Sequence, residues 1–264
     1  QFDVSSMPFG SAELIHLMVE TKKQAFLDRE RFGADPLFVD IPIDYLLSES
    51  HAAELAKKIN FKKSATVPLA GTKNHAGDTT YFCVVDSEGN AVSAIQSINS
   101  VFGSGMTGET TGILFNNRMA YWHLDKTHSN YLISGKRVRH TMNAPIVLKD
   151  DKLWAIFGTP GADNQVQINF QIAVAMIDYN LDPQQAVEAT RWSSSQKGQG
   201  ANWPHEGTDC LTIEKGLLPR TIQGLEKRGH SIQLIDKLDG PCSVACIKVL
   251  KNNTRMAGSD PRRD

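Results

Sequence analysis

The sequence predicts a layered α+β fold built around antiparallel sheet, and three observations support this class. Apolar residues recur at helical spacing early in the chain, they alternate with polar residues after residue 79, and the predicted helices and strands fall in separate groups. The 264 residues suffice for one large domain or two small ones, and a content of 41% hydrophobic and 22% charged residues is globular. We therefore expect a folded protein with a sizeable core.

Residues 1–78 are predicted to be helical and to end in a linker. Leu14, Leu17 and Met18 follow Ser11, a suitable cap, and predict an amphipathic helix to about Phe32. Residues 33–43 contain two prolines and are expected to be loop, and a second helix is expected at about residues 51–59, opened by Ser48. Residues 68–78 are polar, contain glycine and lack periodicity, so they predict a linker.

From residue 79 the apolar period changes to two, which predicts sheet. Residues 79–86 and 91–98 predict a β-hairpin joined by Ser87-Glu88-Gly89-Asn90. After a glycine-rich loop, further strands are expected at residues 113–115, 144–148, 153–157, 210–213, 231–235 and 243–250. Helices are expected at residues 164–178, 183–191 and 219–228.

Charge and apolar pattern exclude several classes of function. The chain has 28 basic and 29 acidic residues, which lacks the basic excess of a nucleic-acid binder or a polybasic membrane anchor. No apolar run approaches the ~18 residues that a membrane helix needs. We therefore expect a small-molecule partner, with no nucleic acid and no membrane. The four scattered cysteines predict free, mostly buried thiols at Cys83, Cys210, Cys242 and Cys246.

Several candidate motifs lack the context that their chemistry needs. The glycine-rich loop Gly103–Gly112 has neither a P-loop lysine nor a strand-GxGxxG-helix setting, which argues against a nucleotide. His123 and His128 flank Asp125 in a loop, without a cysteine or a third ligand, which is weak evidence for a metal. The chain has no GxSxG motif. We expect neither a metal nor a cofactor.

The sharpest signal is Asp78-Thr79-Thr80, at the boundary between the linker and the first strand. A threonine pair that opens a strand is by itself typical of β-propensity. Here it stands among ordered motifs that resemble the γ-glutamyltranspeptidase family of N-terminal nucleophile hydrolases along nearly the whole chain. These motifs are Thr79-Thr80-Tyr81-Phe82, Val84-Val85-Asp86, Gly89-Asn90-Ala91-Val92, Asn99, Phe102-Gly103-Ser104-Gly105, Gly112-Ile113-Leu114-Phe115-Asn116-Asn117, Gly158-Thr159-Pro160-Gly161 and Gly258-Ser259-Asp260-Pro261-Arg262.

The resemblance implies a fold, a maturation and a chemistry. The fold is the four-layer αββα sandwich of N-terminal nucleophile hydrolases, and the protein is a zymogen that cuts itself between Asp78 and Thr79. The freed α-amine of Thr79, with a pKa near 8, can then take the proton of the Thr79 hydroxyl, which attacks an amide and forms an acyl-enzyme. Residues 79–264 correspond to the small, catalytic subunit, and residues 1–78 to the helical end of the large subunit plus the linker. The two segments together form one domain, and about 300 residues of precursor are missing by family analogy.

Site residues carry over from the family position by position. Ser97 matches a hydroxyl beside the nucleophile, and Asn99 matches a substrate-binding asparagine. Gly161 and Ala162 match a Gly-Gly pair whose backbone N–H groups form the oxyanion hole. Alanine in the second place departs from the pair but keeps the donor.

The largest departure from the family transpeptidases follows Asn117. They carry Gln-x-x-Asp there, which holds an ammonium group, whereas this chain has Arg118-Met119-Ala120-Tyr121. Where they carry Ser-Ser after Lys-Arg-Pro-Leu, this chain has the segment Lys136-Arg137-Val138-Arg139-His140-Thr141. We therefore predict that Arg118, Tyr121, His140 and Thr141 bind a small anionic amide without an α-amino group, as in the oxamate-type branch of the family. The alternative for Arg118 is a surface or structural arginine.

The predicted function is that of a self-processing amidohydrolase with an N-terminal threonine. The alternatives are a γ-glutamyl transferase or glutathione hydrolase, a cephalosporin acylase, and an uncleaved homologue that acts only as a binding module. The expected partners are a small amide substrate and the missing part of the large subunit. The expected assembly is a heterodimer of processed subunits, or a dimer of such heterodimers. No leader is observable, and a cytoplasmic location is favoured.

Overall fold

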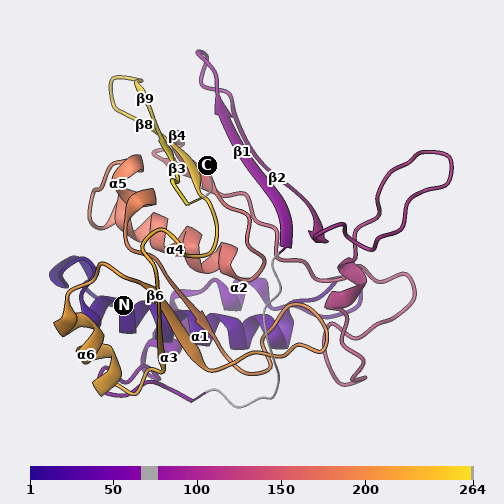
Figure 1. Cartoon of the computed structure of the whole chain (residues 1–264), viewed down its shortest axis with the longest axis horizontal. Helices are drawn as coiled ribbons and strands as arrows, with labels where there is room; N and C mark the ends of the chain where they lie inside the picture. The colour runs from indigo at the N-terminus through magenta and orange to yellow at the C-terminus, as the bar shows by residue number, and fades with distance from the viewer. Residues whose placement is uncertain (67–76, 263–264) are drawn as a thin grey trace.

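A computed structural model of the chain describes residues 1–66 and 77–262 (Figure 1). The predicted linker at residues 68–78 therefore lies almost entirely outside the described residues. The helices are α1 (Ala12–Phe32), α2 (Ile43–Leu46), α3 (Glu49–Ala56), α4 (Asn164–Ile177), α5 (Pro183–Glu188) and α6 (Pro219–Lys227), with 3-10 turns η1 (Val4–Ser6) and η2 (Arg118–Tyr121). The strands are β1 (Gly77–Val85), β2 (Ala91–Ser100), β3 (Ile146–Lys149), β4 (Lys152–Gly158), β5 (Trp192–Ser195), β6 (Cys210–Glu214), β7 (Ile232–Ile235), β8 (Ala245–Val249) and β9 (Arg255–Ser259).

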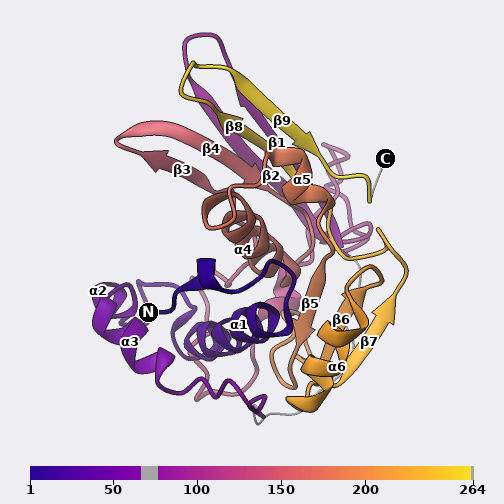
Figure 2. The ribbon, with the colours of Figure 1, turned by 90° about the vertical axis from the view of Figure 1, so that its left-hand side faces the viewer.

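The strands form a hairpin and two further sheets. Strands β1 and β2 pair as an antiparallel hairpin, and a four-stranded antiparallel sheet has the order β3-β4-β8-β9. The hairpin packs on one face of the four-stranded sheet and helices α4 and α5 pack on the other, so the three lie as successive layers (Figure 2). The third sheet, β5-β6-β7, lies with α1 and α6 in the other half of the molecule (Figure 1).

Helix α1 begins after Ser11, as the sequence predicts. It packs against elements that follow residue 79. The Ser11 hydroxyl accepts a hydrogen bond from the Leu14 N–H at 3.2 Å, which satisfies one of the free donors of the first turn. The apolar face of α1, with Val19 fully buried, shares a core with Trp192 of β5 and Leu225 of α6. Residues on both sides of residue 79 therefore share one hydrophobic core.

A second core holds the layers together. Ile168 and Ile172 of α4 are buried against Phe157 of β4 and Cys246 of β8. On the other side of the sheet, the ring of Tyr81 in β1 lies directly against Gly158, where an added Cβ would overlap it. Glycine at this position lets the hairpin approach the end of β4 closely.

The outer face of the hairpin is apolar. Phe82, Val84 and Val92 are each about half exposed, and Val84 pairs directly with Val92 across the ladder. Phe82 and Val84 are two residues apart on one strand, so all three side chains lie on one face. Within residues 1–66 and 77–262, no element covers that face.

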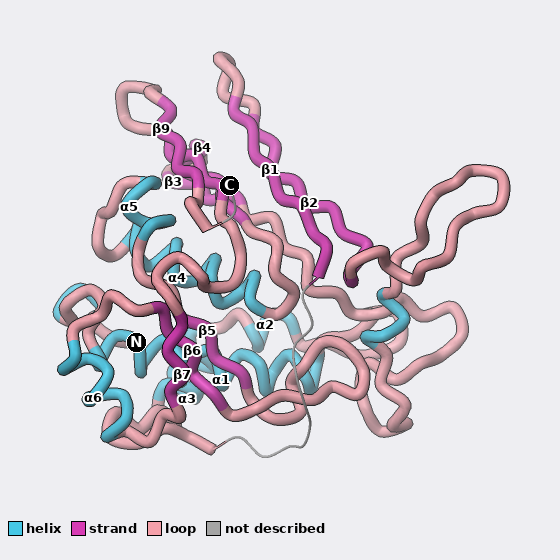
Figure 3. The backbone as a smooth tube through the Cα atoms, viewed as in Figure 1, coloured by secondary structure: helices cyan, strands magenta, loops and turns pink. Residues whose placement is uncertain are grey.

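Most predicted elements are confirmed, and the structure differs from the prediction in several elements. Residues 113–115 form only one isolated bridge, Thr107 with Leu114, inside the long loop region between β2 and β3 (Figure 3). The helix predicted to reach residue 191 ends at Glu188, and the polar run Trp192–Ser195 is strand β5. Strand β9 was not predicted. Strand β7 pairs parallel to β6 because helix α6 crosses between them, which is how parallel neighbours are connected.

The prediction of mostly buried thiols is confirmed, since Cys242 and Cys246 are buried and Cys83 and Cys210 are partly buried. Of the described helices, none has the length and apolarity needed to span a bilayer.

Candidate active site

Thr79 lies in β1 with its hydroxyl on a serine of the neighbouring strand. Thr79 pairs with Ser97 of β2, and its Oγ1 donates a hydrogen bond of 2.8 Å to Ser97 Oγ. The register shifts between Asp78, which lies opposite Asn99, and Thr79. The ladder is therefore irregular at the Asp78–Thr79 peptide bond, the predicted cleavage site.

Asn99 is fixed in an unusual conformation behind Ser97. Its φ of 77° is left-handed, a region that asparagine tolerates better than most residues. Its backbone N–H donates to Ser97 Oγ at 2.9 Å, and its side-chain Nδ2 donates to Asn117 Oδ1 and Asn202 Oδ1 at 2.9 and 3.0 Å. Asn99 is 4% exposed. Both protons of its amide are engaged, so the carboxamide is held in one orientation.

The segment Gly158–Ala162 connects β4 to α4 and carries the predicted oxyanion donors. Gly161 has φ 131° and Ala162 has φ 48°, so both residues are in conformations that turn the chain sharply. The carbonyls of Gly161 and Ala162 accept hydrogen bonds from Asn164 and Gln165 in the first turn of α4. Among the described residues, neither the Gly161 nor the Ala162 N–H donates to another protein group. Two adjacent donors therefore remain for a ligand oxygen at the start of a helix.

Contacts from α1 and from Cys242 hold the segment Gly158–Ala162 in place. Arg29 of α1 donates from Nη1 to Asp163 Oδ1 at 2.6 Å, and from Nη2 to the Gln199 carbonyl at 2.6 Å. Cys242 Sγ lies so close to Gly161 that an added Cβ there would overlap it. The oxyanion segment is therefore positioned by α1 and by the residues before β8.

Arg118 directly follows Asn117, which is tied to β2. The Asn117 N–H donates to the Ile98 carbonyl at 3.2 Å, and its side chain exchanges hydrogen bonds with Ser100. Arg118 is 9% exposed, and its Nη1 donates to the Tyr121 hydroxyl at 2.7 Å. No described carboxylate lies within ion-pair distance of Arg118, and its buried Nε has no partner among the described residues.

The other residues predicted around Arg118 differ in their exposure. Tyr121 is 1% exposed, and its hydroxyl contacts both Arg118 and Thr141, the latter at 3.2 Å. Tyr121 and Thr141 therefore support the guanidinium. His140 is exposed, and partial burial of its ring together with the charge of Arg118 lowers its pKa. Arg139 instead pairs with Glu30 of α1 at 3.1 Å.

Two groups in the described part of the chain have the residue types of a metal site. His123 and His128, which the sequence left without a third ligand, lie 3.9 and 3.6 Å from Glu30. Their rings are stacked 3.4 Å apart and 5° from parallel, so one ion cannot lie in both ring planes. In the second group, His16 Nδ1 lies 2.7 Å from His230 Nε2, which is a hydrogen bond. Neither arrangement assigns a metal.

Some residues that position the site were not predicted. Asn202 holds Asn99, and Arg29 and Asp163 hold the oxyanion segment. Asn117 ends the motif Gly112–Asn117 and precedes Arg118, so its role could have been inferred from the sequence. Asn202 lies in a loop about a hundred residues away and has no local signal.

The layered α+β fold, with a threonine in the first strand of the hairpin, is that of the N-terminal nucleophile hydrolases, as its structural neighbours show. A family model described as Gamma-glutamyltranspeptidase matches residues 1–264, and the chain belongs to that family.

Three known proteins illustrate the similarity. The glutathione hydrolase-like YwrD proenzyme of Bacillus subtilis (strain 168) is 37% identical over 264 residues, covering 100% of this chain and 48% of the relative. The oxamate amidohydrolase proenzyme of Klebsiella pneumoniae is 31% identical, covering 95% of this chain and 46% of the relative. The crystal structure of cephalosporin acylase from Bacillus halodurans superposes with a TM-score of 0.82 at 29% identity, covering 99% of this chain and 46% of that structure. The chain thus spans about half the length of these relatives.

Proposed function

We propose that this chain is the catalytic part of a self-processing amidohydrolase that acts on a small anionic amide without an α-amino group. The observation that carries the substrate class is Arg118, a buried guanidinium with no described carboxylate beside it. A buried charge without a partner is costly, and a substrate carboxylate would provide that partner in bidentate form. The proenzyme names of two relatives support the self-processing.

Maturation would begin at the Asp78–Thr79 peptide bond. The Thr79 hydroxyl, held by Ser97 at 2.8 Å, attacks the Asp78 carbonyl carbon, and the acyl group moves from nitrogen to oxygen. Water then hydrolyses the ester, which leaves a carboxylate at Asp78 and a free amine at Thr79. The register shift at this bond supports the assignment because the strand pairing there is already disrupted.

Substrate hydrolysis would use the same hydroxyl. The freed α-amine takes the proton of Thr79 Oγ1 as the oxygen attacks the substrate amide carbon. The negative oxygen of the tetrahedral intermediate receives hydrogen bonds from the N–H groups of Gly161 and Ala162. The protonated α-amine then gives its proton to the leaving nitrogen, and water hydrolyses the acyl ester to release the acid.

The charged residues of the site would favour substrates with a carboxylate over substrates with an ammonium group. By the resemblance, Arg118 and Tyr121 stand where family transpeptidases carry the glutamine and the aspartate that hold an ammonium group. A γ-glutamyl substrate would bring its ammonium beside the Arg118 guanidinium, with desolvation that nothing offsets. An acid amide such as oxamate would instead pair its carboxylate with Arg118. Asn99, held by Asn117 and Asn202, keeps its carboxamide oxygen in a fixed position for the substrate.

The exposed apolar face of β1 and β2 supports a second subunit. Phe82 and Val84 of β1, the strand that carries Thr79, form an exposed apolar surface with Val92 of β2. Because the chain spans about half of its relatives, we propose that the remaining part of the large subunit covers this face. The processed protein would then be a heterodimer.

A pair of matched substrates tests the proposal. Glutaryl-p-nitroanilide and γ-glutamyl-p-nitroanilide differ only in the α-amino group, and oxamate is the short acid amide. We expect kcat/KM of the processed enzyme to favour the glutaryl compound at least tenfold, and Arg118→Gln to remove that preference.

A preference for the γ-glutamyl compound would refute the substrate class. It would favour the second candidate, glutathione hydrolysis, which the name of the 37% identical Bacillus subtilis relative supports.

A further inference from the structure

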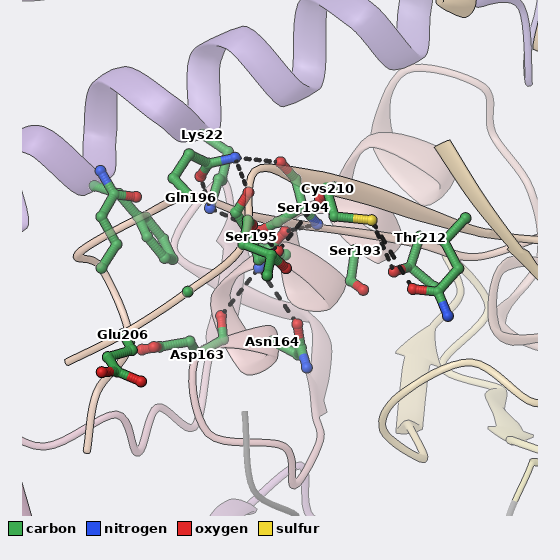
Figure 4. Close-up of a pocket in the computed structure, with 17 residues that line it drawn as sticks. Lys22, Asp163, Asn164, Ser193, Ser194, Ser195, Gln196, Glu206, Cys210 and Thr212 are labelled. Atoms are coloured by element: carbon green, nitrogen blue, oxygen red, sulfur yellow. Dashed lines mark hydrogen bonds between the residues drawn. The ribbon is translucent and has the colours of Figure 1, made fainter. Parts of the chain in front are cut away.

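A polar cavity of about 260 Å³ lies between α1, the start of α4 and strands β5 and β6 (Figure 4). It is not the candidate active site, because neither Thr79 nor Arg118 lines it. Asp163 and Asn164, which directly follow the oxyanion segment, form part of its wall. The remaining lining residues are Lys22, Phe26, Gln167, Ser193, Ser194, Ser195, Gln196, Gln199, Gly200, Glu206, Gly207, Thr208, Cys210, Thr212 and Gln233.

Lys22 is a buried amine that has only neutral hydrogen-bond partners. Its side chain extends from α1 toward β5, where Nζ donates to the Ser194 carbonyl at 2.8 Å and to Gln196 Oε1 (Figure 4). Lys22 is 4% exposed, and Nζ lies 4.0 Å from the centre of the Phe26 ring. Among the described residues no carboxylate lies within ion-pair distance, and Asp163 is already paired with Arg29 at 2.6 Å. Lys22 therefore lacks a negatively charged partner.

The wall of the cavity offers further polar groups. Gln199 is 4% exposed, and neither amide atom of its side chain has a partner among the described residues. Hydroxyl groups of serine and threonine and the amides of Asn164 and Gln167 complete the lining. A purely apolar ligand would leave these groups unsatisfied. Asp163 and Glu206 would repel a ligand with several negative charges.

We infer that this cavity binds a small molecule with one carboxylate and a hydroxyl group, and that the carboxylate pairs with Lys22. The carboxylate supplies the missing counter-charge, and the hydroxyl group can exchange hydrogen bonds with the amide and hydroxyl lining. Binding of this ligand at Lys22 does not require catalysis at Thr79.

The affinity of this cavity for a carboxylate should depend on pH through the charge of Lys22. The pKa of Lys22 is lowered to about 7, first by burial and then by the positive charge of Arg29. A carboxylate binds the protonated amine, so its affinity should fall about tenfold per pH unit above pH 7. The charged and titratable groups that face Lys22 or line the cavity are Arg29 and Lys23 of α1, Asp163 before α4, Glu206, Asp209 and Cys210.

Calorimetric titration with glycolate tests the inference, with glycolamide as its uncharged analogue. All proteins carry Thr79→Ala, so that neither compound is turned over. We expect glycolate to bind at about millimolar concentration at pH 6.5, to bind at least tenfold more weakly at pH 8.5, and glycolamide not to bind. Lys22→Met, which keeps the length of the side chain, should remove binding, whereas Lys197→Met at an exposed lysine should not.

The Arg118→Gln variant separates this site from the active site. Glycolate binding that survives Arg118→Gln and disappears in Lys22→Met supports the inference. Binding that disappears in Arg118→Gln and survives in Lys22→Met places the carboxylate at the active site and overturns it, as does equal binding of glycolamide or no binding of glycolate. If Lys22→Met does not fold, glycolate should still protect Lys22 of the unsubstituted protein from reductive methylation; an unchanged rate, measured by mass spectrometry, overturns the inference.

Discussion

Replacing Arg118 with methionine should stabilise the protein and reduce its activity on acid amides. The guanidinium is 9% exposed and has no described carboxylate partner, so it carries a desolvation cost of about 5 kcal/mol. Its 2.7 Å hydrogen bond to Tyr121 and its position 5.0 Å from that ring recover about 3 to 4 kcal/mol. Arg118→Met should therefore raise the free energy of unfolding by about 1 to 2 kcal/mol. The Tyr121 hydroxyl keeps Thr141 as a partner, so no buried group is left without one.

The effect on activity has the opposite sign. If Arg118 pairs with a substrate carboxylate, its removal costs about 3 kcal/mol of binding in the transition state, roughly a hundredfold in kcat/KM for oxamate. Activity is measured on the processed enzyme. Stability is measured by urea unfolding in a Thr79→Ala background, where the chain stays in one piece and two-state analysis is simplest.

A buried arginine elsewhere provides the control. Arg191 pairs with Asp260 at 2.7 Å, and both side chains are at most 3% exposed. Arg191→Met removes one partner of a buried pair and should lower the free energy of unfolding by about 3 kcal/mol. If Arg118→Met is destabilising to the same extent and leaves kcat/KM for oxamate unchanged, Arg118 is a structural arginine and the substrate assignment is wrong.

Three further predictions concern the nucleophile, the oxyanion segment and pH. Ser97→Ala should lower kcat by about tenfold or more at nearly constant KM, since Ser97 orients Thr79; an unchanged kcat would contradict this role. Gly161→Ala should lower kcat by at least a hundredfold because its Cβ overlaps Cys242, whereas Ala162→Gly should keep kcat and relieve about 1 kcal/mol of strain; equal kcat in both variants would exclude this segment as the oxyanion hole. Burial, and then the two stacked histidines, lower the pKa of His123 to about 3. The unfolded chain therefore binds more protons than the folded protein, and the free energy of unfolding should fall as pH drops from about 6.5 toward 3. Urea unfolding at pH 7 and 4.5 should show a smaller fall in His123→Phe.

The sequence predicted those helices and strands that depend on capping residues and on the alternation of apolar residues. Ser11 caps α1, Ser48 caps α3, and alternation predicted the hairpin of β1 and β2. Strand β5 was missed because Trp192–Ser195 has three serines and no apolar alternation; it is a strand through its pairing with β6. Parallel pairing of β6 and β7 depends on which edge the chain reaches after α6, and no local pattern encodes that.

Some contacts of the candidate site could be predicted from the sequence motifs, and others depend on tertiary packing. The resemblance placed Thr79 and Ser97 together, and the structure gives the 2.8 Å contact between their hydroxyl groups. The support for Asn99 from Asn202, and the approach of Glu30 to His123, join residues that are about a hundred positions apart. Such contacts follow from tertiary packing and could not be predicted from spacing. The support that Tyr121 gives Arg118 was also missed, since a motif fixes a position in the chain but not the direction of the side chain.

The proposed chemistry depends on Thr79 becoming an N-terminus. Mass spectrometry of the purified full-length precursor, before and after incubation at neutral pH, measures this directly. We expect a fragment that begins at Thr79 to accumulate from the unsubstituted protein, and Thr79→Ala to remain a single chain. A correctly folded precursor that never yields an N-terminus at Thr79 would contradict self-processing by Thr79, and so would cleavage at the same bond in Thr79→Ala.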